Sequence, residues 1–515
     1  MRWEDYLAIF FLILLLVYRW STANYNFFKD RGIDHHKPYP FLGSMWKMIL
    51  LQKSMFDLTI ELYNQSNSKV YGIFEQRTPI LMIRDPELIK KITIKDFDHF
   101  MNHWNIFGAD NDDPHDMDNM FGSSLFSMRD TRWKDMRSTL SPAFTCSKMR
   151  QMFQLMDLVA NDSLQCLKSD QYSKDGFEVD IKDYFTRFTN DVIASTVFGL
   201  QVNSFKVRKN IFFMLGKKLT ELTILQNIKF FLFTRSKKVF GLTLFDKKST
   251  DYFVRLVMNA MKYRQENNIV KQDMINMLME ASGMIQTDKT KSGIIRNWNT
   301  SEIVAQCFIF FFAGFENSAV LMCFTAHELM ENEDVQKKLY EEVDQVNSDL
   351  EGGQLTYDAL MGMKYMDQVV SEVLRKWPAA VAIDRECNKD ITYVVDGKNV
   401  EIKKGEVIWF PVSGFHRDPK YFKNPEKFDP ERFSDENKDN IQPFTYFPFG
   451  AGPRSCIASR FALIEAKAVI YYLLRDFRIV ASKKSTIPMV LNPNGFQMKP
   501  KNGFWLKLIP RNKNF

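Results

Sequence analysis

A run of 24 residues from Ile303 to Ala326 constrains the fold more than any other segment, because Glu316 is its only charged residue. The run is long enough for a helix that crosses a membrane. However, Glu316 lies near its midpoint, where an unpaired charge costs about 3 kcal/mol in lipid. We therefore interpret the run as a long helix through the core of a large folded body, with a second membrane span as the alternative.

A second apolar run, from Tyr6 to Val17, lies near the N-terminus. A helix from Trp3 to Trp20 would be about 27 Å long, close to the hydrocarbon thickness of about 30 Å. The alternative is a cleaved signal peptide, which favours basic residues before its apolar run. Here Glu4 and Asp5 precede the run, so residues 1–20 are predicted to be a retained membrane anchor.

Basic residues follow this anchor and predict that the downstream chain lies on the cytosolic side of the membrane; they are Arg19, Lys29, Arg31 and Lys37. The six cysteines are scattered without a CxxC pair, as is typical of a reducing compartment. Residues 21–45 contain Pro38 and Pro40 between Lys37 and Gly43 and predict a stiff, extended neck. A body of residues 46–515 completes the predicted organisation.

Helical periodicity dominates this body between Trp133 and Trp377, and strand-like stretches cover residues 69–83 and 391–407. The second stretch contains Asp396-Gly397, which is typical of a hairpin turn. With 45% hydrophobic and 25% charged residues, the composition is that of a globular protein. The net charge of +7 is too small to indicate nucleic-acid binding, but it suits a membrane surface or an acidic partner. The fold class is predicted to be mainly α with a small β-sheet region.

The most specific motif is the loop Phe447–Ala458 (FPFGAGPRSCIA), which a helical segment follows. Free N–H groups and the dipole at a helix start favour a thiolate at Cys456. The glycines allow a flat ligand to approach the backbone closely, and Arg454 can form an ion pair with an anionic group. These are the requirements of an axial thiolate to haem iron. The alternative is a Gly/Pro loop that caps the helix, with Cys456 as a small buried side chain.

This loop resembles the haem-thiolate signature of the cytochrome P-450 superfamily: Phe449, Gly452, Arg454 and Cys456 match it, and Ala458 replaces the last glycine. The resemblance covers the whole chain and is strongest to insect microsomal members of family nine. It implies a large P-450-type helical domain with a small β-sheet region behind one N-terminal anchor helix. It also implies haem b as the cofactor, with Cys456 as the ligand of its iron.

Further motifs carry the same resemblance. Glu372-x-x-Arg375 places two charges one turn apart on a helix, and the family buries such a pair with a second arginine, here Arg432. The resemblance also implies that Trp133, Arg137 and Arg385 contact the haem propionates. The implied cofactor-binding residues are Trp133, Arg137, Arg385, Phe449, Arg454 and Cys456.

Within the apolar run, residues 313–318 (AGFENS) resemble the stretch that crosses the distal haem face in this family. The resemblance implies that Ala313 and Gly314 leave room for dioxygen and that Glu316 and Asn317 deliver protons. Asn317 stands where the family usually has threonine.

By their positions in the family pattern, five residues are predicted to line the substrate site: Phe121, Phe126, Ile309, Phe312 and Ala380. The alternative is that their side chains only pack in the core. Residues 205–245 mix phenylalanines with basic residues. They predict either amphipathic helices of the body or a lip over the substrate entrance that dips into the membrane.

The function implied is a monooxygenase of the endoplasmic reticulum membrane that inserts one oxygen atom from O2 into a lipophilic small molecule. The chain has no visible nucleotide-binding motif, so NADPH-derived electrons would come from a diflavin reductase, with a small b-type cytochrome as a further partner. Because Asn317 replaces the usual alcohol, an oxygen-independent isomerase or lyase acting on a lipid hydroperoxide is the main alternative. A non-catalytic haem sensor is a third.

Overall fold

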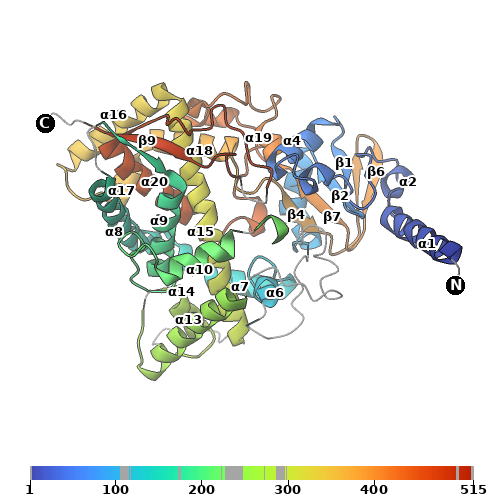
Figure 1. Cartoon of the computed structure of the whole chain (residues 1–515), viewed down its shortest axis with the longest axis horizontal. Helices are drawn as coiled ribbons and strands as arrows, with labels where there is room; N and C mark the ends of the chain where they lie inside the picture. Colours follow the sequence, from blue (N-terminus) through green and yellow to red (C-terminus); the bar gives the residue numbers. More distant parts are fainter. Residues whose placement is uncertain are drawn as a thin grey trace.

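The computed structural model describes residues 3–104, 115, 117–171, 175–221, 223–226, 247–271, 273–285, 296, 298–494 and 498–511. Most helices gather around α15 (Thr300–Glu331), and a strand-rich part lies at the other end of the molecule (Figure 1). The hydrophobic core divides in the same way, into a large helical cluster and a smaller one around the sheet. The predicted fold class, mainly α with a small β-sheet region, is confirmed.

The apolar run forms the central helix α15, which starts with a capping box between Asn299 and Glu302. The helices with the most extensive contacts to it are α6 (Met117–Gly122), α9 (Ile181–Thr196), α18 (Lys364–Lys376) and α20 (Ser459–Asp476). In its most apolar window, 67% of α15 is buried inside the body. The prediction of a core helix is confirmed, and the alternative of a second membrane span is wrong.

The remaining helices surround these two cores. Around the helical core lie α7 (Asp130–Leu140), α8 (Cys146–Gln171), α10 (Ile211–Thr220), α13 (Lys247–Glu266), α14 (Met274–Ala281), α16 (Glu333–Asp349) and α17 (Tyr357–Gly362). Shorter helices cover the sheet, namely α2 (Phe27–Asp30), α3 (Trp46–Ile49), α4 (Met55–Asn64), α5 (Pro86–Lys90) and α19 (Val412–His416).

The largest sheet has four strands in the order β1 (Val70–Glu75), β2 (Thr78–Ile83), β7 (Val407–Phe410) and β4 (Ile383–Glu386). β1 and β2 form the first predicted hairpin, and the second consists of β5 (Ile391–Val395) and β6 (Lys398–Ile402). A third sheet joins β3 (Phe177–Asp180), β9 (Trp505–Pro510) and β8 (Phe477–Val480). Pairing of β4 with β7 fixes Arg385 opposite Ile408.

The predicted extended neck is wrong between Tyr39 and Gly43, which form a tight turn. The N–H of Gly43 donates to the carbonyl oxygen of Tyr39 at 2.8 Å, and Phe41 has a φ of 65°. Upstream, Phe28 is fully buried, with its ring centroid 5.0 Å from that of Phe74 on β1. The neck therefore packs onto the sheet, because its apolar side chains find partners there.

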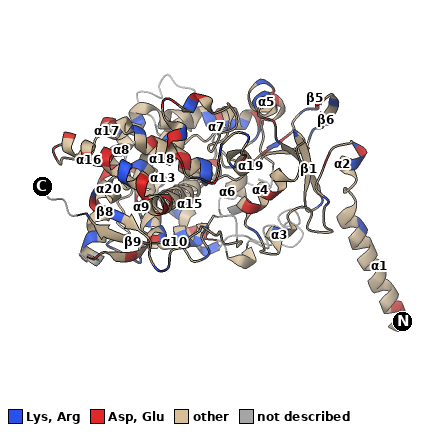
Figure 2. Cartoon of the chain, turned by 90° about the horizontal axis from the view of Figure 1, so that it is seen from above, with Lys and Arg blue, Asp and Glu red and all other residues tan. Residues whose placement is uncertain are grey.

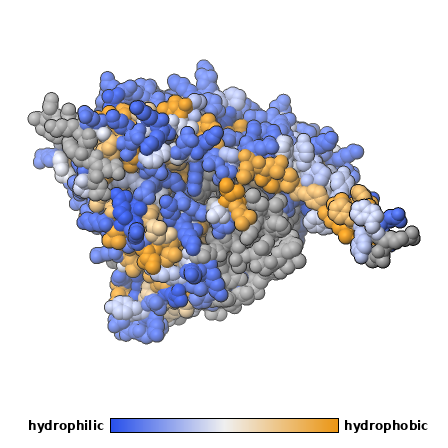
Figure 3. Space-filling model, in the orientation of Figure 1, coloured by the Kyte–Doolittle hydropathy of each residue, from blue (hydrophilic) through white to orange (hydrophobic). Residues whose placement is uncertain are grey.

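Helix α1 (Trp3–Thr22) projects away from the body (Figures 1 and 2). Only 6% of its most apolar window is buried, and large apolar side chains such as Phe11 and Leu16 are exposed (Figure 3). An exposed apolar helix of 20 residues is compatible with association with a membrane.

Candidate functional site

The loop before α20 presents Cys456 to the interior of the molecule. The N–H of Cys456 donates to the carbonyl oxygen of Phe449 at 2.8 Å. Gly452 has a φ of 71°, and a Cβ atom there would collide with the carbonyl oxygen of Thr93. Only glycine fits this position, since other residues would be both strained and blocked. The backbone therefore holds Cys456 three residues before α20 begins at Ser459.

The Cys456 side chain is accessible, yet protein surrounds it closely enough for burial to raise the pKa of its thiol. The backbone N–H of Ala458 and the guanidinium of Arg137 act in the opposite direction. The predicted stabilisation of a thiolate by the helix start does not prevail here, because desolvation outweighs it. The side chain is therefore accessible although protein atoms lie close around it.

Arg454 is a buried cation beside this loop. Its guanidinium lies over the ring of Trp133 at 4.1 Å. Burial, followed by the positive charge of Arg385, lowers the pKa of Arg454 to about 8. Its hydrogen bonds go to backbone carbonyl oxygens, those of Met101, Leu125, Phe126 and Met128. Its side chain forms no ion pair with any carboxylate in the part of the chain that the structure describes.

Arg385 on β4 is a second buried guanidinium, only 1% exposed. It donates to the carbonyl oxygen of Asp384 at 2.6 Å and lies 3.4 Å from Nδ1 of His103. Burial lowers the pKa of Arg385 to about 10, although the Asp384 carboxylate opposes this shift. That carboxylate contacts His103 at 3.0 Å and accepts from the N–H of Trp104. It is therefore already engaged by other groups.

Arg137 on α7 is the third guanidinium of this group, and it donates to the carbonyl oxygen of Ser455 at 2.9 Å. Together Arg137, Arg385 and Arg454 carry three positive charges, and among the described residues Asp384 is the carboxylate that acts on Arg385 and Arg454. Unpaired charges in a protein interior are strongly destabilising. A bound ligand with two carboxylates would neutralise the two remaining charges, and the two propionates of haem fit this requirement, with the Cys456 sulfur beside them as a ligand for iron.

One face of α15 also borders an accessible space. Ile309 and Ala313 are partly exposed and Asn317 is exposed, whereas most of the helix is buried. These three residues are spaced four apart and therefore share one face of the helix. We call them the accessible stripe of α15.

Gly314 and Glu316 face α9 instead of this stripe. A Cβ atom at Gly314 would lie 3.0 Å from Cδ1 of Ile193, so glycine lets the two helices pack closely. Glu316 is 4% exposed, and one of its carboxylate oxygens pairs with the Lys182 ammonium while the other has no hydrogen-bond partner. That Ala313 and Gly314 leave room for dioxygen stays a prediction.

A cytochrome P450 family model matches residues 35–506. The chain belongs to the cytochrome P450 family. It is 67% identical to "Probable cytochrome P450 9f2" of Drosophila melanogaster over 517 residues, covering 99% of this chain and 100% of the relative. It is 46% identical to "Cytochrome P450 9b2" of the same fly, covering 96% and 97%, and 33% identical to "Cytochrome P450 3A11" of Mus musculus, covering 97% and 95%.

These relatives confirm the predicted resemblance to insect family nine. At the level of the family, this P450 is a monooxygenase of the oxidoreductase class whose cofactor is a haem with a thiolate ligand to iron. The buried guanidiniums and the accessible Cys456 are the features of its own structure that suit such a cofactor.

The predicted charged network behind the Cys456 loop is present in this P450. Glu372 and Arg375 are both fully buried, and the carboxylate accepts two hydrogen bonds of 2.7 Å from the guanidinium. Nε of Arg432 lies 3.4 Å from the same carboxylate. Arg375 also donates to the carbonyl oxygen of His416 at 2.7 Å. The network therefore ties α18 to the segments that precede the Cys456 loop.

The predicted substrate-lining residues are divided between core and accessible positions. Phe121 is only 7% exposed and packs edge-on against Phe312, with ring centroids 5.2 Å apart. Phe126 is 48% exposed, Ile309 and Phe312 are partly exposed, and Ala380 is exposed after α18. Their contact with substrate stays a prediction. Within the predicted lip, residues 222 and 227–245 lie outside the described residues.

Several polar groups at the site were not predicted from the sequence. His103 and Asp384 sit beside Arg385, Lys182 pairs with Glu316, and Glu465 lies buried on α20. The one available signal was that Asp384 directly precedes Arg385 in the sequence. Lys182 is separated from Glu316 by more than 130 residues, so no local pattern connects them.

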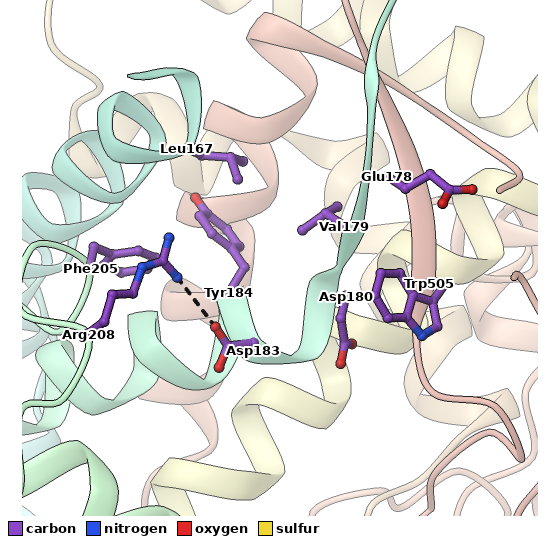
Figure 4. A pocket seen from close by; sticks show the side chains of 9 residues that line it. All are labelled: Leu167, Glu178, Val179, Asp180, Asp183, Tyr184, Phe205, Arg208 and Trp505. Atoms are coloured by element: carbon purple, nitrogen blue, oxygen red, sulfur yellow. Dashed lines mark ion pairs between the residues drawn. The ribbon is translucent and has the colours of Figure 1, made fainter. Parts of the chain in front are cut away.

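A separate surface pocket of about 310 Å³ lies near β3, the start of α9 and β9 (Figure 4). Two ion pairs lie at this pocket: Asp183 lies 3.6 Å from Arg208, and Glu178 lies 3.3 Å from Lys484, which is not one of the lining residues. Because its lining contains none of the predicted site residues, we treat it as distinct from the Cys456 site.

Proposed function

We propose that this P450 is a microsomal monooxygenase that inserts one oxygen atom from O2 into a lipophilic small molecule. The observation that supports it best is the accessible Cys456 beside three guanidiniums and, in the part of the chain that the structure describes, the single carboxylate of Asp384. Haem b would be held by Cys456 at its iron and by Arg137, Arg385 and Arg454 at its propionates. Trp133 would support this arrangement by packing under Arg454, and Phe449 by holding the Cys456 backbone.

When bound, the haem supplies the activation of dioxygen, and the chain supplies positioning and protons. Ala313 on the accessible stripe is small and leaves space on that face of α15. The Asn317 amide can both donate and accept hydrogen bonds, so it can hold a water molecule there. We assign the supply of protons along α15 to Glu316, the residue before Asn317. We assign to Gly314 the close helix packing that positions Glu316 and Asn317.

The proposed electron source is NADPH, through a diflavin reductase, with a small b-type cytochrome as a second donor. Lys and Arg alternate with Asp and Glu along the ribbon (Figure 2), and the net charge is +7. We assign residues 1–20 to an anchor in the endoplasmic reticulum membrane, 21–45 to a neck and 46–515 to the cytosolic catalytic domain. Substrates would reach Phe126, Ile309, Phe312 and Ala380 from the lipid.

Reconstitution tests this function directly. The purified chain is combined with haem, NADPH, a diflavin reductase and a set of lipophilic probes, and oxygenated products are measured. Product that requires NADPH, reductase and O2 together supports the monooxygenase. Asn317 motivates the second candidate, a hydroperoxide isomerase or lyase. Rearrangement of a lipid hydroperoxide without NADPH, and no oxygenated product with it, would replace the first proposal by the second.

Deleting residues 2–22 tests the proposed location. We expect the shortened chain to detach from membranes more readily while still incorporating haem, because the body has its own core. Sedimentation of cell membranes and the haem absorption spectrum measure the two effects. Secretion of the full-length chain, cleaved after the apolar run, would show that the segment is a signal peptide.

Replacing Asn317 tests the proposed proton delivery. Asn317→Ala removes the amide that holds the water, so we expect nearly unchanged haem and substrate-binding spectra but more peroxide released per NADPH consumed. Asn317→Thr restores a hydroxyl and should restore coupling. Product and peroxide per NADPH are measured for all three proteins. Equal coupling in all three would mean that Asn317 takes no part in proton delivery.

A further inference from the structure

His416, the last residue of α19, is a fully buried histidine that the proposed function does not use. Its Nδ1 lies 3.1 Å from the carbonyl oxygen of Arg375, and its Nε2 lies 3.1 Å from the backbone nitrogen of Phe447. A carbonyl oxygen can only accept and a backbone N–H can only donate, so Nδ1 must donate and Nε2 must accept. Burial, followed by the positive charge of Arg375, lowers the pKa of His416 to about 3. The ring is therefore neutral at physiological pH, with its proton on Nδ1.

The first of these hydrogen bonds caps the C-terminal end of α18. The carbonyl groups in the last turn of a helix have no partner within the helix, and α18 ends at Lys376. His416 donates to the Arg375 carbonyl oxygen, and the next residue, Arg417, donates to that of Lys376 at 2.8 Å. In return, the Arg375 guanidinium donates to the carbonyl oxygen of His416 at 2.7 Å. The side chains of Arg375 and His416 thus each hold the backbone of the other residue.

The second hydrogen bond holds the first residue of the Cys456 loop. Phe447 is buried, and its N–H donates to Nε2 of His416. Its carbonyl oxygen accepts from the N–H of Gly450 at 2.9 Å, and the Phe449 carbonyl oxygen accepts from the N–H of Cys456 at 2.8 Å. A buried N–H that loses its acceptor is costly. The loop that carries Cys456 is therefore fixed at its start by an imidazole nitrogen and closed within itself by backbone hydrogen bonds.

We propose that His416 is a positioning residue for the iron ligand Cys456. Its neutral ring connects the buried ion pair of Glu372 and Arg375 to the start of the Cys456 loop, so that the loop keeps one position relative to α18. Replacing such outer partners of a metal ligand typically costs about 10–100-fold in metal affinity or activity. The inference rests on the proposed assignment of Cys456 to the haem iron, and it explains how the Glu372–Arg375 pair acts on that ligand from outside the loop.

Three variants of the full-length holoenzyme separate the two hydrogen bonds. In His416→Gln the amide oxygen replaces Nε2 and can accept from Phe447, whereas in His416→Asn the amide nitrogen replaces Nδ1 and can donate to Arg375. His416→Phe keeps a flat ring against Tyr446, whose ring centroid lies 5.3 Å from that of His416, but it makes neither bond. The thiolate-type Soret band of the reduced carbon monoxide complex should decay about tenfold faster in His416→Asn and His416→Phe, and at nearly the wild-type rate in His416→Gln. Equal decay in His416→Asn and His416→Gln would overturn the proposal.

Amide hydrogen exchange gives a second measurement that depends neither on turnover nor on the identity of the iron ligand. In the wild type, the N–H of Phe447 should be as protected as that of Ile479, which donates to the buried side chain of Gln336 at 2.9 Å. Rapid exchange at Phe447 would overturn the proposal without any variant. In His416→Asn and His416→Phe, exchange should accelerate at Phe447 and not at Ile479. Equal acceleration at both would show a general loss of stability and would also overturn it.

His327→Asn is the matched control, because His327 on α15 is another buried histidine. This variant should keep the Soret band and the exchange rates of Phe447 and Ile479. Retention of the thiolate-type band in Cys456→Ser would instead overturn the assignment of Cys456 to the iron, and amide exchange at Phe447 would then still test the hydrogen bond from Phe447 to His416.

Discussion

Replacing Cys456 by serine should abolish the thiolate-type Soret band of the reduced carbon monoxide complex, together with monooxygenase activity. Only the thiolate sulfur donates enough electron density to iron to favour O–O cleavage. A serine oxygen is a harder ligand and keeps its proton at neutral pH. The difference spectrum between reduced protein with and without carbon monoxide measures the effect, and a complete loss of the band is expected.

The matched control is Cys146→Ser. Cys146 is also exposed, but it begins α8 and accepts a hydrogen bond from Arg460 at 3.2 Å. We expect this variant to keep both the band and the activity. If Cys456→Ser behaves in the same way as Cys146→Ser, the assignment of the iron ligand to Cys456 is wrong.

Replacing Glu372 by alanine should destabilise the protein by about 3–5 kcal/mol, the cost of leaving one member of a buried ion pair without its partner. The Arg375 guanidinium is 0% exposed and would lose both of its 2.7 Å hydrogen bonds to the carboxylate. Because a folded domain is typically stable by about 5–15 kcal/mol, we also expect weaker haem retention. Urea unfolding followed by circular dichroism measures the apparent free energy.

An exposed pair provides the control for this effect. Arg150 and Asp358 form two hydrogen bonds of 2.5 and 2.7 Å, but both side chains are more than half exposed. Solvent screens such pairs and they contribute little to stability. Asp358→Ala should therefore leave the unfolding curve nearly unchanged. A similar loss of stability in both variants would show that burial of Glu372 and Arg375 is not what makes their pair important.

Local patterns in the sequence predicted the main elements correctly. The two hairpins follow from β-branched stretches around turn residues, and the helices α1 and α15 follow from long apolar runs. The spacing of three residues placed Glu372 and Arg375 on one helix face, and the resemblance to the family predicted that the pair is buried. In each of these cases the interaction that decides the structure lies within a few residues of chain, so one sequence carries the signal.

Packing between distant segments decided what the local pattern could not. The neck was predicted to be extended, but Phe28 packs against Phe74 and the chain turns between Tyr39 and Gly43. Cys456 was predicted at a helix start that favours a thiolate, but the surrounding protein raises the pKa of its thiol. Burial depends on every segment that folds around a residue, and no short pattern encodes it.

The sequence by itself determined the family, through the spacing of Phe449, Gly452, Arg454 and Cys456, because an axial ligand loop needs these residue types within a few positions. Only the tertiary structure decided which side chains meet around it. It turned Glu316 toward Lys182 on α9 and placed His103 against Asp384. The physical reason is that charge state and proton transfer depend on distance in space, and helix packing sets that distance between residues far apart in the chain.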